Sequence, residues 1–413
     1  MYNPTFGLQS LDRQILKSDF KRHKDLNLEN CQARDALVQE AVEFAKNGLT
    51  SFNLKCNDVA GRKIYTLTHL PTQLVLRKAT ENLSRISRAK QASRLDIVER
   101  MALICSEGVP FSIAKFDIKQ FYQSIDHSRL KTTLHRRLAT APSTRFVLDE
   151  FIDRCSSLSI EGLPAGLSIS AVLAEMYMQD FDASMKSDAD TYFYARYVDD
   201  IIIIRPYTEN QDTFNHSVIE ELPYGLRLNA KKTEFYTFSG GYKKDPITEH
   251  KFNYLGFSFD IGEICNKDRK NSPKRSVIID ISQSKVNKIK TRIIKSLLQF
   301  NIDKNYNDLK DRFRLICGNY KFYDYSKSRF RFAGTSHTYS LIQQPSCSLQ
   351  ELDSFKNKIL LTNSGRTCRH INFTSRQRRE LLSLNFSKYH SNKTHFHFPP
   401  NRLKKLMECW KYA

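Results

Sequence analysis

The feature that most constrains the fold is a pair of apolar segments that carry aspartates at their ends. Residues 111–118 alternate between apolar and polar positions like a strand, and Asp117 lies near its end. Residues 192–205 predict two strands joined by a tight turn at Asp199-Asp200. If these strands are neighbours, the acids converge at one edge of one sheet.

Three carboxylates at one edge need a partner of opposite charge. They repel one another strongly unless cations neutralise them. Hard oxygen ligands suit Mg²⁺, which keeps some waters and takes substrate phosphates as further ligands. Two such ions about 3.5–4 Å apart would activate a primer 3′-hydroxyl and stabilise the departing pyrophosphate. An Asp-Asp turn can also be purely structural, because Asp favours turns. The surrounding sequence motifs must therefore decide between a metal site and a structural turn.

The rest of the chain mixes helix and strand patterns. The pattern predicts helices at 33–47, 72–88, 94–106, 127–156, 168–185, 211–221 and 282–299. It predicts strands at 62–67, 226–238 and 252–260. Beyond residue 276 the pattern becomes mostly helical and basic, and residues 326–350 are predicted to be the least ordered stretch.

The positive charge is concentrated in the last third of the chain. The 413 residues carry a net charge of +21. Residues 261–413 hold 31 Lys and Arg against 11 Asp and Glu, whereas residues 1–260 hold 34 against 33. Aromatic residues that could stack on bases lie among these charges: Phe322, Tyr323, Tyr325, Phe330, Phe332 and Phe373. The combination favours nucleic acid as the partner, the alternative being a basic surface without a specific partner.

Membrane and secreted classes fit poorly. The longest aliphatic run, Ile201–Ile204, is far below the roughly 18–20 residues of a membrane span. The first residues lack the basic-then-apolar layout of a signal peptide. The nine cysteines are scattered and form no CxxC pair, which argues against a structural zinc module and fits a reducing compartment. We therefore expect a cytoplasmic protein without a membrane partner.

Five segments occur in a characteristic order. They are Phe-Asp-Ile-Lys-Gln-Phe-Tyr at 116–122, Gly-Leu-Pro-Ala-Gly-Leu-Ser-Ile-Ser at 162–170, Tyr-Val-Asp-Asp at 197–200, Gly-Leu-Arg-Leu-Asn-Ala-Lys-Lys-Thr at 225–233 and Tyr-Leu-Gly-Phe at 254–257. The series resembles motifs A to E of reverse transcriptases, especially the prokaryotic group with the group II intron and retron enzymes, over about residues 55–260.

The resemblance implies an α+β, right-hand polymerase fold with fingers, a palm built on an antiparallel sheet, a helical thumb and a basic C-terminal extension. Its domains would be an N-terminal region with fingers at 1–108 and a palm at 109–262, interrupted by a fingers insertion at about 127–160. A thumb at 263–330 and an RNA-binding extension at 331–413 would follow.

The resemblance also assigns the metal site. Asp117 and Asp199 look like the principal ligands of two Mg²⁺ ions, for which Mn²⁺ can substitute, and the carbonyl of Ile118 completes the site. Asp200 has a supporting electrostatic role. Lys232 matches the motif D lysine, a candidate acid for protonating pyrophosphate.

Tyr122 stands where family members carry an aromatic steric gate. A ring there would collide with a ribonucleotide 2′-hydroxyl, so that deoxynucleotides are favoured. The alternative reading is an aromatic residue of the core.

Further residues are assigned to nucleotide, primer and RNA. Nucleotide contacts are expected from Gly166 and from the fingers residues Arg62 and Lys63, for which a solvated charged turn is an equal alternative. The primer grip is expected at Tyr254, Leu255 and Gly256. RNA binding in the basic last third is expected at Arg376, Arg378 and Arg379.

The motif B segment departs from the family pattern. Ala165 stands where Gln is common, Ser170-Ala171 where Ser-Pro is common, and Glu175 where Asn is common. These changes put ordinary template handling, fidelity or processivity in doubt. The phrase Gly-Leu-Pro-x-Gly followed by Ser and Ala-Glu looks more like the defence-associated, antiphage reverse transcriptases of bacteria, in particular the smaller polymerase of the type-three systems. That resemblance implies a noncoding RNA partner and either a second reverse transcriptase or a homo-oligomer.

Three functions compete at this point. The first is an RNA-directed DNA polymerase that uses deoxynucleotides and an RNA template to make a DNA product. The second is an RNA-dependent RNA polymerase, against which Tyr122 and the Tyr-Val-Asp-Asp segment argue. The third is a non-catalytic RNA-binding protein on a decayed palm, against which the survival of all three acids argues.

Overall fold

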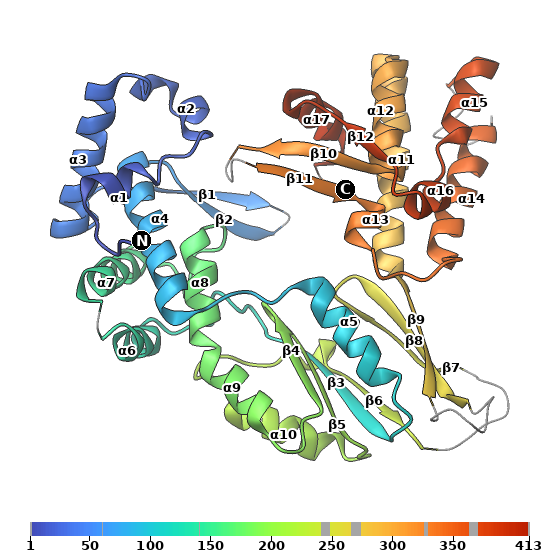
Figure 1. The fold of residues 1–413 in the computed structure, drawn as a ribbon, viewed down its shortest axis with the longest axis horizontal. Coiled ribbons are helices and arrows are strands. Elements are labelled where there is room, and N and C mark those ends of the chain that lie inside the picture. Colours follow the sequence, from blue (N-terminus) through green and yellow to red (C-terminus); the bar gives the residue numbers. More distant parts are fainter. Residues whose placement is uncertain are drawn as a thin grey trace. The chain divides into compact units, whose positions relative to one another are not determined.

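The computed structural model describes residues 2–59, 61–139, 141–240, 248–265, 274–325, 329–362 and 371–411. The chain divides into two compact units (Figure 1). Unit 1 comprises residues 1–97 and 109–239, and unit 2 comprises residues 98–108 and 240–413. Helix α5 (Arg94–Cys105) carries the chain from the first unit into the second.

Unit 2 contains two small sheets and a group of helices. The first sheet is antiparallel, in the order β7 (Thr248–Tyr254), β8 (Phe257–Cys265), β9 (Lys274–Ile281). The second has the order β11 (Arg329–Gly334), β10 (Asn319–Asp324), β12 (His395–His397). The helices are α11 (Gln283–Asp303), α12 (Tyr306–Cys317), α13 (Thr335–Thr338), α14 (Cys347–Leu361), α15 (Ser375–Ser383), α16 (Phe386–Ser391), α17 (Pro400–Met407) and the 3₁₀ turn η3 (Glu408–Trp410).

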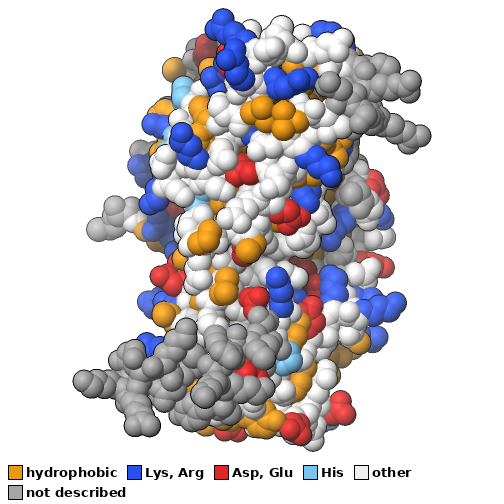
Figure 2. Space-filling model, turned by 90° about the vertical axis from the view of Figure 1, so that its right-hand side faces the viewer, with side chains coloured by type: hydrophobic (Ala, Val, Ile, Leu, Met, Phe, Trp, Pro, Cys, Tyr) orange, Lys and Arg blue, Asp and Glu red, His pale blue; other side chains and the backbone are white. Residues whose placement is uncertain are grey.

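Unit 2 is rich in basic residues, because residues 261–413, all of which belong to it, hold 31 Lys and Arg against 11 Asp and Glu. Figure 2 shows Lys and Arg side chains spread over the face it draws, among acidic and apolar side chains. Among the described residues, no helix combines the length and the apolar character that crossing a bilayer requires.

Unit 1 is organised around a four-stranded antiparallel sheet. Its order is β4 (Phe193–Tyr197), β5 (Asp200–Pro206), β3 (Phe111–Asp117), β6 (Glu234–Phe238). Ile201–Ile204 are completely buried, as expected for a central strand that is covered on both faces. Phe116 points toward helix α10 (Gln211–Glu221), where its ring lies 6.5 Å from that of Phe214.

Helices and a hairpin complete unit 1. The N-terminal elements are α1 (Leu8–Asp12), α2 (Asp19–Arg22), η1 (Lys24–Leu26), α3 (Cys31–Asn47), the hairpin β1 (Leu54–Val59) with β2 (Arg62–Leu67), and α4 (Leu70–Ser87). The others are α6 (His127–Arg137), α7 (Pro142–Ser157), α8 (Ser168–Tyr177), α9 (Gln179–Ser187) and the 3₁₀ turn η2 (Ala230–Lys232). The helix predicted at 127–156 is two helices, because Pro142 begins a new one and cannot continue the old one.

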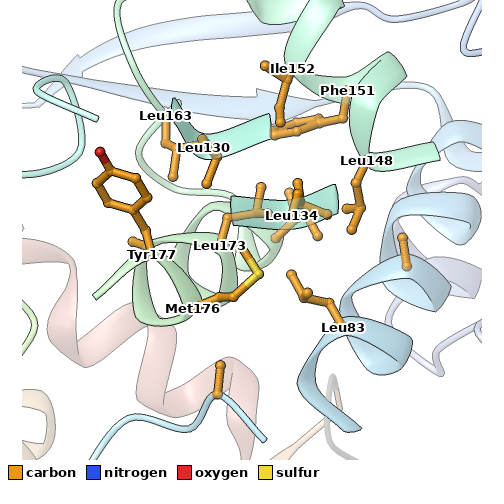
Figure 3. Close-up of a cluster of buried hydrophobic side chains, with 14 of the residues drawn as sticks. Leu83, Leu130, Leu134, Leu148, Phe151, Ile152, Leu163, Leu173, Met176 and Tyr177 are labelled. Carbon is orange, nitrogen blue, oxygen red and sulfur yellow. The ribbon is translucent and has the colours of Figure 1, made fainter. Parts of the chain in front are cut away.

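A hydrophobic core cluster of unit 1 joins these helices. Leu83 of α4, Leu134 of α6, Leu148 of α7 and Leu173 of α8 point toward one another (Figure 3). All four are fully buried. Burying a leucine stabilises the fold by about 1.5–3 kcal/mol, so this cluster fixes helix α8 and the residues 162–167 that precede it. The α+β class predicted from the sequence is confirmed.

Candidate active site

The three aspartates meet at one end of the central strands, as the sequence predicts. Asp117 ends β3 and lies opposite Asp200, the first residue of β5. The backbone N–H of Ile118 donates to the carbonyl of Asp199 at 3.0 Å, which ties the two strand ends together. Val198 adopts a left-handed conformation with φ of 61° and so makes the turn between β4 and β5 tight.

The carboxylates repel one another and are partly removed from water. Burial, followed by the charges of Asp199 and Asp117, raises the pKa of Asp200 to about 6. Burial and the charge of Asp117 also raise the pKa of Asp199. Both shifts mean that the ionised cluster is unfavourable in the absence of additional positive charge.

Lys232 supplies one positive charge to this cluster. Its Nζ lies 2.6 Å from Oδ1 of Asp117, and this hydrogen bond is the main cause that raises the pKa of Lys232. The side-chain amide of Asn229 donates to Oδ2 of Asp117 at 3.2 Å. Asn229 lies in the predicted motif D segment but was not singled out by the sequence, because an Asn before a turn has an ordinary turn-forming role.

The segment that carries Lys232 is not the strand predicted at 226–238. Only Glu234–Phe238 form a strand. Before it, the N–H of Asn229 donates to the carbonyl of Asp117 at 2.8 Å, and Leu228 forms a single bridge with Ile118. The chain passes the end of β3 rather than running along it, and this path brings the turn η2 and its lysine to the acids.

Tyr122 faces the same site from a partly buried position. Its pKa is raised by burial first and then by the charges of Glu175 and Asp199. The backbone carbonyl of Tyr122 accepts from the N–H of Leu163 at 2.8 Å. Gly162 has a φ of 59°, and a Cβ there would lie 2.2 Å from that carbonyl oxygen. The tyrosine therefore packs against the core, near enough to Glu175 and Asp199 for their charges to act on its hydroxyl, and its role as a steric gate stays a prediction.

The hairpin β1–β2, which was predicted to belong to the fingers, is hydrogen-bonded to the predicted motif B loop. Tyr65 of β2 donates its N–H to the carbonyl of Ala165 at 2.8 Å. Gly166 has a φ of 105°, and a Cβ there would lie 2.7 Å from the carbonyl oxygen of Tyr65. Arg62 and Lys63 are exposed at the start of β2. The charge of Arg62 acts to lower the pKa of Asp199, against the effect of burial.

The sequence matches one protein family over the part of the chain that carries these residues. Residues 53–259 match the family model described as reverse transcriptase (RNA-dependent DNA polymerase), which is half of the chain. The chain belongs to the reverse transcriptase family. The predicted right-hand polymerase fold is confirmed by this match.

Comparisons with individual proteins give distant similarities. No curated protein matches this reverse transcriptase. One similar solved structure is apo telomerase from Candida tropicalis truncated from the C-terminal domain, with 16% identity and a TM-score of 0.35, over 51% of this chain and 53% of that chain. Another is telomerase from Candida albicans in complex with the TWJ fragment of telomeric RNA, with 14% identity and a TM-score of 0.34, over 82% of this chain and 53% of that chain. The reverse transcriptase chain thus spans about half the length of these structures.

Oxygen donors in this reverse transcriptase fit Mg²⁺ by their chemistry. The carboxylates of Asp117, Asp199 and Asp200 are hard ligands. Burial first and then the neighbouring carboxylates raise the pKa of Asp199 and Asp200, so added positive charge would favour their ionised forms. Within the described ranges, no three His, Cys, Asp or Glu side chains are grouped closely enough to hold a metal by themselves. Waters and substrate phosphates would have to supply further ligands, as is usual for Mg²⁺.

A buried ion network supports the turn that carries Asp199, and the sequence did not predict it. The guanidinium of Arg196 lies 2.7 Å from a carboxylate oxygen of Glu175 and 2.8 Å from one of Asp182. It also donates to the carbonyl of Val198 at 2.9 Å. Only 3% of the Arg196 side chain is exposed. Glu175, which stands where the family commonly has Asn, is therefore the partner of the arginine that holds the turn.

We predict that Arg196→Met strongly destabilises the protein and lowers any activity that depends on Asp199. The substitution leaves two partly buried carboxylates, whose side chains are 15% and 20% exposed, without their cation. Losing one partner of a fully buried pair costs about 3–5 kcal/mol, so we expect a loss toward the lower end of that range or somewhat below it. Urea denaturation should show this loss. The triple variant R196M/E175Q/D182N should recover most of it, because no buried charge is then left unpaired. A single variant as stable as the parent would contradict the role of the network.

A second prediction concerns the metal-free protein. Because the folded-state pKa of Asp200 is raised from 3.8 to about 6, stability from this group is fully present below about pH 3.8 and is lost as pH rises through about 6. Asp200→Asn should therefore melt a few degrees above the parent at about pH 7.5 and together with it at about pH 4. The exposed substitution Asp212→Asn is the control and should show no such pH-dependent gain. Equal melting temperatures of D200N and parent at both pH values would contradict the repulsion.

The remaining predicted residues lie in unit 2. Tyr254 is buried, and Leu255 and Gly256 have φ of 48° and 81°. They form the turn between β7 and β8, so the single strand predicted at 252–260 was wrong. The N–H of Ser282 donates to the carbonyl of Gly256 at 3.2 Å and fixes this turn to the start of α11.

The three arginines predicted to bind RNA lie together on α15 but differ in exposure. Arg376 is 87% exposed and its Nε lies 3.4 Å from a carboxylate oxygen of Glu380. Arg379 is exposed, whereas Arg378 is partly buried. Arg376 and Arg379 are therefore the better placed of the three to reach a phosphate.

Proposed function

We propose that this chain is an RNA-directed DNA polymerase that adds deoxynucleotides to a primer 3′-hydroxyl on an RNA template. The observation that carries the proposal is the pairing of Asp117 with Asp200 across β3 and β5, with Asp199 in the adjoining turn. Family membership supports the same activity. Electrostatic repulsion among the acids supports a divalent cation as the cofactor.

Two Mg²⁺ ions, or Mn²⁺ in their place, would be held by Asp117, Asp199 and Asp200 together with the carbonyl of Ile118. When bound, they would favour the ionised 3′-hydroxyl and the developing charge of pyrophosphate. Lys232 holds a proton 2.6 Å from Asp117. In our proposal this proton is available to the departing pyrophosphate.

Other residues of unit 1 would select and orient the nucleotide. The ring of Tyr122 would exclude a 2′-hydroxyl beside Asp199. Arg62 and Lys63 would neutralise the triphosphate, and the backbone at Gly166 would approach the nucleotide closely because no side chain intervenes.

Unit 2 would hold the nucleic acids. The turn at Tyr254, Leu255 and Gly256 would position the primer end, and Arg376, Arg378 and Arg379 would bind RNA. The motif B phrases support a noncoding RNA as the template and a role in antiviral defence in the cytoplasm, with a second reverse transcriptase or another copy of this chain as a further partner.

Primer extension tests the proposal directly. With a DNA primer annealed to an RNA template, the purified chain and Mg²⁺ should extend the primer with deoxynucleotides, and a chelator should stop the reaction. Ribonucleotides offered alone should give little product. Efficient extension with ribonucleotides would favour an RNA polymerase instead, and RNA binding without any extension would favour a non-catalytic protein. Sequencing the nucleic acid that copurifies with the chain would identify the template.

A further inference from the structure

One face of the sheet β11–β10–β12 gathers aromatic and basic side chains. In the strand register, Lys321 lies opposite Phe332 and Tyr323 opposite Phe330. On the other side of β10, Lys321 pairs with His397 of β12. Because cross-strand partners point to the same side of a sheet, these residues share a face. We call it the aromatic face, and it consists of Lys321, Tyr323, Phe330, Phe332, His395 and His397.

The aromatic face is open to solvent. Phe330 is 50% exposed and Phe332 is 46% exposed, and both histidines are exposed as well. Phe330 contacts Tyr323 with ring centroids 5.2 Å apart, and Phe332 contacts His395 at 5.5 Å, both edge to face. These contacts hold the rings in place, and about half of each phenylalanine stays accessible to solvent.

The opposite side of the same sheet is packed against helices, which explains why only one face is exposed. Phe396 lies against Gly318, where a Cβ would come within 2.6 Å of its ring. The guanidinium of Arg314 lies 5.6 Å from the centroid of that ring, and the ring of Tyr389 lies 5.7 Å from it. Burial raises the pKa of Tyr320 on this side. Helices α12 and α16 thus hold the sheet rigid from behind.

Positive charge accompanies the exposed rings. The Nζ of Lys321 lies 4.1 Å from the ring centroid of Phe330 and 5.9 Å from that of Phe332. Arg329 and Arg331 are exposed on the edge strand β11, where the strand alternation directs them to the other side of the sheet from Phe330 and Phe332. Asp324 is the acid within this hairpin, and it lies 3.3 Å from Arg331. A surface for an apolar protein segment or a lipid would not need a cation between its two most exposed rings.

We propose that the aromatic face binds single-stranded nucleic acid, with bases stacked on Phe330 and Phe332 and phosphates at Lys321. Aromatic rings interleaved with cations on an exposed sheet suit unpaired bases, whereas a duplex hides the faces of its bases. The inference rests on the proposed function only for the origin of the strand, which would be the unpaired template or the DNA product.

Binding of short oligonucleotides to the full chain tests this inference. The variant F330L/F332L keeps apolar area but removes both rings, and F330W/F332W keeps rings. The matched control L298A/I302A removes exposed apolar area on α11, where these side chains are 43% and 79% exposed. Labelled oligo(rU), oligo(dT) and a blunt RNA duplex of the same length are the probes.

We expect F330L/F332L to bind the single strands at least tenfold more weakly, because stacking on each ring contributes to affinity. Its affinity for the duplex should change less than about twofold. F330W/F332W and the α11 control should bind single strands like the parent. A loss confined to oligo(rU) would assign the face to template, and a loss for both oligomers would assign it to either strand. Unchanged single-strand affinity of F330L/F332L would overturn the inference, as would an equal loss in the α11 control.

The oligonucleotide-binding experiment tests the aromatic face independently of the polymerase activity. A chain that binds single strands through this face but never extends an annealed primer would overturn the polymerase activity and leave the face as a binding site. A chain that extends primers, but whose variant F330L/F332L binds single strands like the parent, would support the polymerase activity and overturn the aromatic face as a binding site. Thermal melting of each variant should match the parent, because the replaced rings are half exposed.

Discussion

Replacing Asp199 and Asp200 together with Asn should abolish DNA synthesis. The two carboxylates lie at the end of β5 with Asp117 and would hold the catalytic cations. Losing several kcal/mol of transition-state stabilisation should slow extension at least a thousandfold, since about 1.4 kcal/mol corresponds to a factor of ten. Rates of primer extension for parent and double variant measure the effect directly.

The fold of that variant should survive, which separates chemistry from stability. Asn preserves the shape of each side chain and removes the charge whose burial, followed by repulsion from the neighbouring acids, raises the pKa of Asp199 and Asp200. RNA affinity and melting temperature should therefore equal or exceed those of the parent. The control D190N/D212N removes the same charge from exposed positions of unit 1 and should remain active. Extension by D199N/D200N at even a tenth of the parent's rate would refute the assignment.

The strands that carry the acids were predictable because their alternation of apolar and polar residues is a local feature of the sequence. The alternation at 111–118 and the turn before Ile201–Ile204 depend on side chains within a few residues of one another. From the sequence, convergence of the acids depended on the two strands being neighbours, and the structure shows that β3 pairs with β5. The sequence therefore located Asp117, Asp199 and Asp200 correctly at one strand end, whereas their catalytic role stays a prediction.

The secondary-structure predictions were wrong where contacts between residues distant in sequence determine the backbone conformation. Residues 252–260 form a hairpin because Leu255 and Gly256 adopt positive φ, and a Tyr-Leu-Gly sequence does not by itself require a turn. Residues 329–338 were predicted to be weakly ordered, yet they form β11 and α13. Their order comes from pairing with β10, which a local pattern cannot show.

The Arg196 network could not be predicted, because its members are distant in sequence. Glu175 lies on α8, Asp182 on α9 and Arg196 on β4. From the sequence, Glu175 was only a departure from the family's usual Asn. In the structure it forms a buried ion pair that holds the turn beside Asp199. The effect of this change on template handling stays a prediction.

Replacing Tyr122 with Val should weaken the distinction between deoxynucleotides and ribonucleotides. Burial first, and then the charges of Glu175 and Asp199, raise the pKa of Tyr122, and its backbone is fixed by the hydrogen bond from Leu163. A ring held in this way blocks a 2′-hydroxyl rather than binding the sugar, so removing it should raise ribonucleotide use and leave deoxynucleotide use nearly unchanged.

The measurement is the ratio of kcat/KM for a deoxynucleotide to that for the matching ribonucleotide. We expect this ratio to fall at least tenfold in Tyr122→Val, which corresponds to about 1.4 kcal/mol of lost discrimination. Tyr122→Phe is the control and should keep the ratio, because it retains the ring and loses only the hydroxyl. If Tyr122→Val is as selective as the parent, the ring belongs to the core alone, since its partly buried position allows that reading. Sugar selection would then have to come from another residue near Asp199, and an RNA-synthesising activity would again compete with DNA synthesis.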